Sequence, residues 1–261
     1  MTTPAVASAR YPELAGRTVF VSGGASGIGE AFVRAFAGQG ARVAFVDIDD
    51  EGAQGLVDAL EGGVTYRHCD VRDVDALQRV IDDIGRELGA LRVLVNNAGR
   101  DDRHRLDDVT PAYWDERMAL NLRHHFFAAQ AAARQMTAAG GGVILNLGSV
   151  SWMRGRPELA AYTTAKAAIM GLTRTLAREL GQHAIRVNAI VPGAIDTPRQ
   201  RALWLSDAQE RELLAQQCLK FRVTPDDVAQ TALFLASDAA RAITGQSVVV
   251  DAGLAQTSVV A

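Results

Sequence analysis

The sequence predicts an α/β fold built on one parallel β-sheet, and three observations lead to this prediction. Short runs rich in apolar and β-branched residues alternate with amphipathic helical stretches along the whole chain. The first of these runs ends in a glycine cluster that opens directly into the first helix. No shift in composition, internal repeat or low-complexity segment marks a linker. We therefore expect a single-domain, Rossmann-like, doubly wound parallel sheet of about seven strands with helices on both faces.

Strands are expected where short apolar runs are bounded by polar or glycine-rich turns, as in buried parallel strands. In chain order these runs are residues 17–22, 41–47, 64–69, 91–95, 142–147, 185–191 and 246–250. Helices are expected between them, where apolar residues recur every three or four positions. They are residues 29–39, 50–60, 74–88, 111–136, 159–180, 206–217 and 224–236.

Local signals support several helix bounds. The first helix carries Phe32 and Phe36 on one face and ends in a glycine-containing turn. Thr110 stands immediately before Pro111, which is the arrangement of an N-cap followed by proline in the first turn. Thr224 caps the last helix in the same way. The helical pattern of residues 111–136 continues without a break, so we expect one long helix there.

Composition narrows the class of protein. With 261 residues, 48% hydrophobic and 22% charged, the chain can bury a sizeable core. The formal charge is 27 − 30 = −3, which gives no basic excess for nucleic acid or an anionic membrane. Only Cys69 and Cys218 occur, so we expect neither a disulfide framework nor a metal site. The first residues lack an apolar signal region and no run could cross a membrane, which favours a cytoplasmic protein.

The chain is expected to consist of two unequal parts. Residues 1–12 have no clear pattern and are expected to form a flexible N-terminal arm. Residues 13–261 are expected to form the single domain. Within it, the segment around residues 197–222 is expected to act as a lid over the substrate.

The glycine cluster at Ser22–Gly29 has the spacing G-x-x-x-G-x-G between a strand and a helix. Glycines let the backbone turn tightly and approach a pyrophosphate, whose charge is favoured by the helix N-terminus. An ordinary glycine-rich turn could have the same sequence. The acidic residue that follows favours a dinucleotide-binding loop over an ordinary turn. Asp47 ends the next strand, 18 residues after Gly29, close to the offset of a carboxylate that binds the adenosine ribose.

Asp47 also predicts which dinucleotide is bound. Its carboxylate would repel a 2′-phosphate, and Gly23–Gly29 contains no Lys or Arg to receive one. We therefore expect NAD rather than NADP. Asp70 and Val71 follow the third strand and are candidates for contacts with the adenine.

Tyr162 and Lys166 are four residues apart on an expected helix, so their side chains share a face. A phenol with a pKa near 10 is a poor base at neutral pH. A cation about 4 Å away, at an effective dielectric constant of about 20, favours the phenolate by about 4 kcal/mol, roughly three pKa units. Tyr162 would then accept a proton, although the same spacing also occurs by chance on ordinary surface helices.

Several motifs in their order resemble the short-chain dehydrogenase/reductase family over nearly the whole chain, from about Leu14 to Gly253. They are S-G-x-x-x-G-I-G at Ser22–Gly29, N-N-A-G at Asn96–Gly99, Asn121, Ser149, Y-x-x-x-K at Tyr162–Lys166 and P-G-A-I-D-T-P at Pro192–Pro198. Ser22 stands where Thr is usual in the family, but a hydroxyl remains.

The resemblance implies a role for each matching residue. Tyr162 would be the general base in oxidation, Ser149 would hold the substrate oxygen, Lys166 would hold the nicotinamide ribose, and Asn121 would hold a water in the proton relay. The expected catalytic residues are thus Asn121, Ser149, Tyr162 and Lys166. The expected cofactor-binding residues are Gly23, Ser26, Gly27, Ile28, Gly29, Asp47, Asp70, Val71, Asn96, Ala98, Gly99, Tyr162, Lys166, Pro192, Gly193, Ile195 and Thr197.

The substrate is indicated by a polar run and by neighbouring tryptophan. Residues 100–104, R-D-D-R-H, follow the fourth strand, and Trp152 follows Ser149 closely. Polar groups beside indole rings suit a polyhydroxylated ligand. The expected substrate-binding residues are Asp101, Ser149, Ser151, Trp152, Tyr162 and Gln200.

Further stretches resemble bacterial sugar 1-dehydrogenases: D-D-R-H at 101–104, Y-W-D-E-R at 113–117, N-L-R-H at 121–124, G-S-V-S-W at 148–152 and A-Q-Q-C-L at 215–219. This resemblance implies oxidation of a cyclic aldose at C1 to its lactone with NAD. The first candidate substrate is an aldopentose, with xylose ranked before arabinose. It also implies a homotetramer. Two alternatives remain: a reductase of a 3-oxoacyl or cyclic ketone substrate, and an NAD-binding scaffold without turnover. His124 and His125 are expected to pack in the helix or at an interface.

Overall fold

A computed structural model describes residues 9–204 and 206–256. One parallel sheet runs through the molecule with strand order β3-β2-β1-β4-β5-β6-β7. Its strands are β1 Thr18–Ser22, β2 Arg42–Asp47, β3 Val64–His68, β4 Leu91–Asn96, β5 Gly142–Leu147, β6 Ile185–Pro192 and β7 Ser247–Val250. All seven coincide with the predicted runs to within about a residue at each end. The predicted fold class is therefore confirmed.

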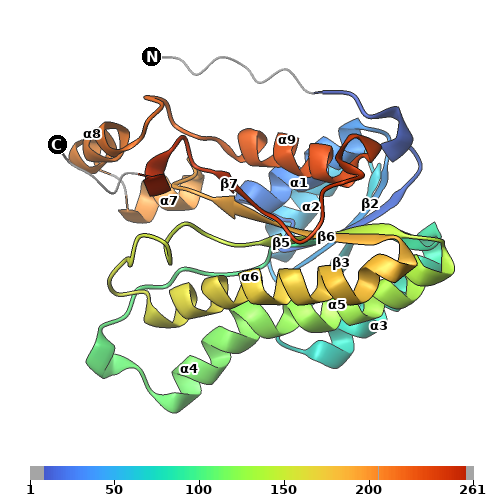
Figure 1. Ribbon diagram of the computed structural model, residues 1–261, viewed down its shortest axis with the longest axis horizontal. Coiled ribbons are helices and arrows are strands. Elements are labelled where there is room, and N and C mark those ends of the chain that lie inside the picture. The colour runs from blue at the N-terminus through green and yellow to red at the C-terminus, as the bar shows by residue number, and fades with distance from the viewer. Residues whose placement is uncertain (1–8, 205, 257–261) are drawn as a thin grey trace.

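The helices among the described residues lie on both faces of this sheet. They are α1 Gly27–Gly38, α2 Asp50–Ala59, α3 Val74–Leu88, α4 Pro111–Met118, α5 His124–Ala138, α6 Ala160–Leu180, α7 Pro198–Trp204, α8 Asp207–Gln216 and α9 Pro225–Ala236. Figure 1 shows α1, α2 and α9 above the sheet and α3, α5 and α6 below it. Helices on both faces bury every residue of the central strand β1, which explains its mostly apolar sequence, whereas the edge strands β3 and β7 are partly exposed.

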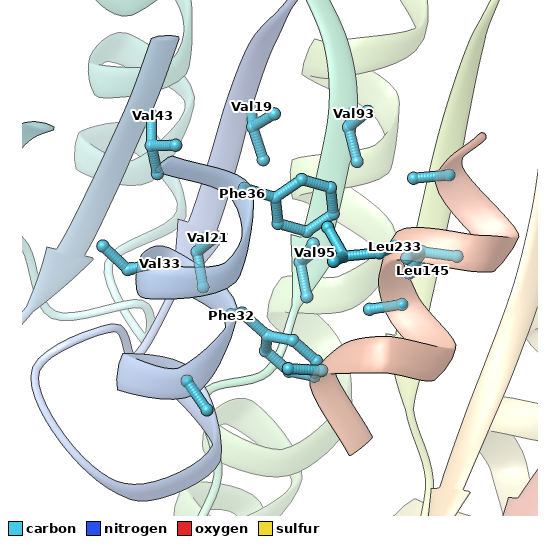
Figure 2. Close-up of a cluster of buried hydrophobic side chains, with 14 of the residues drawn as sticks. Val19, Val21, Phe32, Val33, Phe36, Val43, Val93, Val95, Leu145 and Leu233 are labelled. Carbon is cyan, nitrogen blue, oxygen red and sulfur yellow. The ribbon is translucent and has the colours of Figure 1, made fainter. Parts of the chain in front are cut away.

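The core between α1, α9 and the sheet shows how this packing works. Phe32 and Phe36 of α1 are fully buried among the valines of β1 and β4. Figure 2 shows both rings lying between those strands and Leu233 of α9. The helical spacing of the two phenylalanines puts them on one face, so a single helix stripe fills the space above the sheet.

The stretch predicted as one long helix, residues 111–136, is interrupted. α4 and α5 are joined by five residues of π-helix, Ala119–Arg123, which contain Asn121. Such turns insert one residue into the hydrogen-bond ladder and occur often at functional sites. The spacing of apolar residues is hardly changed by one inserted residue, so the sequence pattern could not predict this π-helical turn.

Two further details differ from the predicted bounds. The first helix begins at Gly27 rather than Gly29, because the end of the glycine loop already belongs to its first turn. α7 was not predicted as a helix, although Pro198 after Thr197 is a start signal, and Thr197 Oγ1 accepts a hydrogen bond from the Gln200 backbone N–H at 3.2 Å.

The N-terminal arm lies mostly outside the described residues, which begin at residue 9. Its last part is held against the end of α1. The Tyr11 backbone N–H donates to Gln39 Oε1 at 2.9 Å, and the Arg10 guanidinium donates to the Gly38 carbonyl at 2.5 Å.

The order of the strands fixes where a site can form. From β1 the chain proceeds outward to β2 and β3, and then returns to the other side of β1 to form β4. The loops after β1 and β4 therefore leave the sheet in opposite directions and open a crevice at its carboxyl edge. Residues at the ends of β1, β2, β4, β5 and β6 meet at that edge.

Candidate active site

A cavity of about 730 Å³ occupies the crevice at the carboxyl edge of the sheet. It runs from the loops after β1, β2 and β3 to the loop after β5 and the first turn of α6. Most residues predicted for the site line it: Gly23, Ser26, Gly27, Ile28, Gly29, Asp47, Asp70, Val71, Ala98, Gly99, Asp101, Ser149, Ser151, Tyr162, Lys166, Pro192, Gly193, Ile195, Thr197 and Gln200.

The glycine loop forms one wall of this cavity. Gly23 has φ +68°, and its backbone N–H donates to the Val46 carbonyl at 2.8 Å. At Gly29 a Cβ would lie 1.8 Å from the Gly23 carbonyl oxygen, so no side chain fits there. Ser26 precedes α1 without a side-chain hydrogen bond to the first turn. The N–H groups at the start of α1 thus lack a side-chain cap, as suits a bound phosphate.

Asp47 lies at the end of β2, beside this loop. Its carboxylate accepts hydrogen bonds from the backbone N–H of Ala25 at 2.9 Å and of Ile48 at 2.8 Å. Both bonds fix the carboxylate at the cavity wall. Because each carboxylate oxygen can accept more than one bond, Asp47 can still receive ribose hydroxyls.

The far end of the same wall is formed by the turn after β3. Arg72 binds the Asp70 carboxylate at 2.6 Å and Glu116 of α4 at 2.6 Å. The Asp70 and Glu116 carboxylates neutralise the positive charge of Arg72, which could otherwise bind the 2′-phosphate of NADP.

The predicted catalytic residues Ser149, Tyr162 and Lys166 meet at the opposite end of the cavity. Ser149 follows β5, and its hydroxyl donates to Ser151 Oγ at 3.0 Å. The Lys166 ammonium lies 5.7 Å from the centre of the Tyr162 ring and donates to the Leu147 carbonyl at 2.8 Å. The bond to Leu147 ties α6 to the end of β5, so the base and the serine are held on neighbouring rigid elements.

The protonation of this pair differs from the sequence-based expectation. The pKa of the Tyr162 phenol is raised because its surroundings exclude water and because the negative charge of Asp101 opposes ionisation; a hydrogen bond to Ser149 acts the other way. Burial lowers the pKa of Lys166 to about 8. The expected lowering of the phenol pKa by Lys166 is thus wrong for the protein alone.

Asn121 is brought to the site by the π-helical turn. Its side chain is fully buried, its Oδ1 accepts from the Arg100 backbone N–H at 2.9 Å, and its Nδ2 donates to the Arg117 carbonyl at 3.1 Å. A Cβ at Gly99 would lie 2.9 Å from Asn121 Oδ1 and 3.4 Å from Lys166 Nζ. Gly99 therefore lets Asn121 and Lys166 come together behind the cavity wall, although Asn121 itself does not line the cavity.

Besides Asn121, two predicted residues, Asn96 and Trp152, do not line the cavity. Asn96 is fully buried and donates to the His125 carbonyl at 3.2 Å and to Asn146 Oδ1 at 3.0 Å, so it joins β4 to β5 and α5 instead of lying along a cofactor. Trp152 is not among the residues that line the cavity, and its indole nitrogen is buried. Successive side chains of a strand point to opposite faces, and the sequence alone does not show which face borders the cavity.

Asn97 is the residue that the sequence reasoning missed at this position. Its side-chain amide donates to the Ser22 carbonyl at 3.1 Å and to the Gly23 carbonyl at 2.7 Å, and it lines the cavity. The signal was available, because the alternation of side chains after β4 makes either asparagine of the pair a candidate.

His124 and His125 are both fully buried in α5, which places them in the interior of this chain. His124 Nε2 contacts the Ala98 carbonyl at 3.0 Å. Burial, with Lys166 nearby, lowers the pKa of His124 to about 3, so the ring is neutral. Of the two predictions, packing within the helix layer is the one that the described structure supports.

The substrate end of the cavity is polar. Gln200 of α7 donates to the Asp101 carboxylate at 3.2 Å, so α7 covers this end from above. Arg199 lies 3.5 Å from Asp101 and 3.0 Å from Asp102. Asp102 is also paired with Arg117 of α4, which fixes the loop after β4. Asp101 also lines the cavity, and because each carboxylate oxygen can accept more than one hydrogen bond, it can still receive a ligand hydroxyl beside Gln200.

The structure describes no helix long and apolar enough to cross a membrane within residues 9–204 and 206–256.

Comparison with known proteins gives the family. A family model described as enoyl-(acyl carrier protein) reductase matches residues 23–255. D-xylose 1-dehydrogenase of Caulobacter vibrioides is 48% identical over 95% of this chain and 99% of its own length. A Rhizobium meliloti protein named "Probable galactose dehydrogenase GalD" is 48% identical over 97% of this chain and 100% of its own.

Solved structures agree with these relatives. A short-chain type dehydrogenase/reductase from Mycobacterium ulcerans superposes with a TM-score of 0.88 at 31% identity, covering 92% of this chain and 90% of that one. A dehydrogenase/reductase from Sinorhizobium meliloti 1021 superposes with a TM-score of 0.85 at 34% identity, covering 92% of this chain and 95% of that one. The chain therefore belongs to the short-chain dehydrogenase/reductase family and is an oxidoreductase that acts on CH–OH groups.

Proposed function

We propose that this enzyme uses NAD to oxidise the C1 hydroxyl of a cyclic aldose to the aldonolactone, with an aldopentose such as D-xylose as the first candidate. The observation that carries the proposal is the polar substrate end of the cavity, where Asp101 and Gln200 are bonded to each other and line the same cavity as Ser149 and Tyr162. Sugar hydroxyls would find hydrogen-bond partners there, whereas an acyl chain would leave these groups unpaired. The two relatives named for xylose and galactose support the same class.

NAD is the proposed cofactor because the residues of the cavity fit it. The uncapped start of α1 would hold the pyrophosphate, Asp47 would accept the adenosine ribose hydroxyls, and Lys166 would donate to the nicotinamide ribose. Pro192, Gly193, Ile195 and Thr197 would lie beside the nicotinamide. When bound, NAD+ supplies the acceptor for the hydride that leaves C1.

The chain's own residues would manage the proton and the oxygen. Ser149 would donate a hydrogen bond to the C1 oxygen and so orient it, and Tyr162 would accept its proton as the C1–H bond breaks and the C1=O bond forms. The proton would then leave Tyr162 by way of Lys166 and of a water held by Asn121 in the π-helical turn. The Lys166 ammonium, and the positive charge of the oxidised nicotinamide, would favour the phenolate once the cofactor is present.

We also propose a homotetramer, on the basis of the family resemblance. Light scattering of the purified protein at micromolar concentration would give about four times the 27.8 kDa of one chain. A monomer would contradict this part of the proposal without touching the chemistry.

The proposed activity is tested by mixing the enzyme with NAD+ and a panel of aldoses and following NADH absorbance. We expect turnover of aldopentoses and aldohexoses, with production of lactone. Tyr162→Phe should lower kcat by about 10²–10⁴ fold, because general base help of this kind has that size, while NAD+ still binds. In a second assay with NADH, reduction of a 3-oxoacyl or cyclic ketone substrate, together with no activity on any aldose, would reject the sugar assignment. NAD+ binding without turnover in either assay would favour a scaffold.

A further inference from the structure

The turn after β5 brings two arginines to the substrate end of the cavity. Arg154 and Arg156 follow Ser149 and Ser151 in the same turn, after Trp152 and Met153. The Arg156 backbone N–H donates to the Ser151 carbonyl at 3.1 Å, and Arg154 N–H donates to the Val150 carbonyl at 3.1 Å. These bonds, with Gly155 at φ +58°, curl the turn back on itself. Both side chains line the main cavity beyond the two serines.

The same arginines also line a second cavity that adjoins the first. It has a volume of about 320 Å³ and lies against α8, with Gln209, Glu212, Leu213 and Gln216 on that side. Gln200 and Ala194 belong to both cavities as well. In Figure 1, α7 and α8 lie at the same end of the molecule as the loop between β5 and α6. The space for substrate therefore continues past Ser149 and Tyr162 towards the arginines.

Arg103, Arg154 and Arg156 all line the main cavity. Loss of surrounding water and then the positive charges of Arg103 and Arg154 lower the pKa of the Arg156 guanidinium, while the Asp101 carboxylate raises it. The carboxylate on the α8 side, Glu212, accepts a hydrogen bond from Gln216 at 3.2 Å. Asp101 is already bound by Gln200 and lies beside Arg199.

Neither arginine of the turn is neutralised by a direct partner. Arg154 donates to the neutral amide oxygen of Gln216 at 2.5 Å. Within the described part of the chain, the Arg156 side chain makes no hydrogen bond and no ion pair. A guanidinium opposed by two other positive charges gains most from an anion, and its planar fork matches the two oxygens of a carboxylate or a phosphate.

We infer that the substrate end of the cavity, besides admitting neutral aldoses such as D-xylose, also binds an aldose with an anionic group remote from C1, a carboxylate as in a uronic acid or a phosphate ester. Arg154 and Arg156 bind that group, so that an anionic sugar is preferred over its neutral counterpart. The inference rests on the proposed function, because that function places C1 at Ser149 and Tyr162. With C1 there, the ring spans the cavity and its far substituent reaches the arginine turn.

The test compares sugars that differ only in the anionic group. D-Glucuronate has the ring of D-xylose with a carboxylate added at C5, and D-glucose 6-phosphate is compared with D-glucose in the same way. We expect kcat/KM to be about 10–100 fold higher for the anionic member of one pair, which is the size expected for a hydrogen bond to a charged group. A preference for D-glucuronate over D-xylose would identify the anionic group as a carboxylate, and a preference for D-glucose 6-phosphate over D-glucose would identify it as a phosphate.

Arg156→Gln should bring the ratio of kcat/KM between the anionic and the neutral sugar close to one, and Arg156→Lys should leave it in between, since lysine keeps the charge and loses the fork. Arg241→Gln, which removes an exposed arginine outside both cavities, should leave the ratio unchanged. Thermal melting shows whether each variant is folded.

The outcomes separate this inference from the proposed function. Turnover of neutral aldoses with ratios near one, in both the wild type and Arg156→Gln, overturns the anionic subsite and leaves the sugar dehydrogenase standing. A preference that survives both Arg156→Gln and Arg154→Gln also overturns it. No turnover of any sugar, neutral or anionic, overturns the proposed function and this inference together.

Discussion

At the scale of single residues, the environment of Tyr162 decides how the site works. Helical spacing predicted that Tyr162 and Lys166 lie together, and they do, with the ammonium 5.7 Å from the ring centre. It could not predict that burial and Asp101 dominate the phenol, since Asp101 comes from a loop 61 residues earlier in the chain. Long-range charge is a property of the fold, which no local pattern reports.

Asp101→Asn should shift the pH dependence of kcat to lower pH. The Asp101 carboxylate raises the pKa of Tyr162, so its removal lowers that pKa and the base becomes ionised at lower pH. The same carboxylate raises the pKa of Lys166, which moves in the same direction. KM for the sugar should also rise, about tenfold or more, because a charged hydrogen-bond partner is lost. Both quantities come from steady-state kinetics between pH 6 and about 10.

Asp102→Asn is the matched control for this substitution. Asp102 is the next residue, but it is paired with Arg117, Arg100 and Arg199 and does not act on the phenol. Its removal should leave the midpoint of the pH profile in place. If both variants shift the profile equally, a loosened loop and not the charge of Asp101 explains the effect.

The residues of the candidate site were predicted unevenly, for a physical reason. Glycines, Asp47 and the Tyr162–Lys166 pair have spacings dictated by one loop or one helix, and all of them line the cavity. Asn96, Asn121 and Trp152 do not line it, whereas Asn97, Arg154 and Arg156 do. Which face of a strand end or turn meets the cavity depends on how the sheet is covered, and that is set by tertiary packing.

At the scale of elements, the two features that sequence periodicity missed both shape the site. The π-helical turn at Ala119–Arg123 is invisible to an apolar repeat, yet it presents Asn121 to Gly99 and to the Arg100 backbone. The short helix α7 places Gln200 over Asp101. Long helices with a strong apolar stripe, such as α3 and α6, were predicted nearly to the residue because the stripe alone determines them.

Gly29→Ala should damage the junction between β1 and α1. Its Cβ would lie 1.8 Å from the Gly23 carbonyl oxygen and 2.7 Å from Asn97 Nδ2, so the loop must move and the bond between those two groups is strained or broken. We expect a loss of about 1–3 kcal/mol in the free energy of unfolding and NAD+ binding that is weaker by at least about tenfold. Urea denaturation and isothermal titration calorimetry measure the two effects.

Gly55→Ala is the control for that prediction, because no atom lies within 4 Å of a Cβ placed at Gly55 in the middle of α2. Alanine should stabilise this helix by roughly 0.5–1 kcal/mol and leave NAD+ binding unchanged. Unaltered NAD+ affinity in Gly29→Ala would mean that the loop can relax without changing the cofactor site.

At the scale of the whole molecule, the fold was predictable because the central strands need burial on both faces. Seven apolar runs separated by helices leave a doubly wound sheet as the arrangement that covers them, and the structure has that arrangement. The crevice then arises where the chain returns from β3 to β4 beside β1, so the position of the site follows from the order of the strands. What remained open is the substrate end, which is formed by loops and by α7 and α8.

Phe36→Ala tests whether the layer of α1 and α9 carries the stability of this sheet. Phe36 is fully buried between the sheet and Leu233 of α9, as Figure 2 shows, and its loss leaves a cavity that the surrounding strands cannot fill. We expect the free energy of unfolding to fall by about 3–5 kcal/mol in urea denaturation. Phe234→Ala, on the same α9 but 36% exposed, should cost less than about 1 kcal/mol. Below the unfolding transition, Phe36→Ala should keep its kcat, because Phe36 does not line the cavity. Equal losses in the two variants would show that burial under α9 is not what holds the sheet, whereas a loss of kcat in the folded Phe36→Ala protein would show that the α1 layer also positions the site.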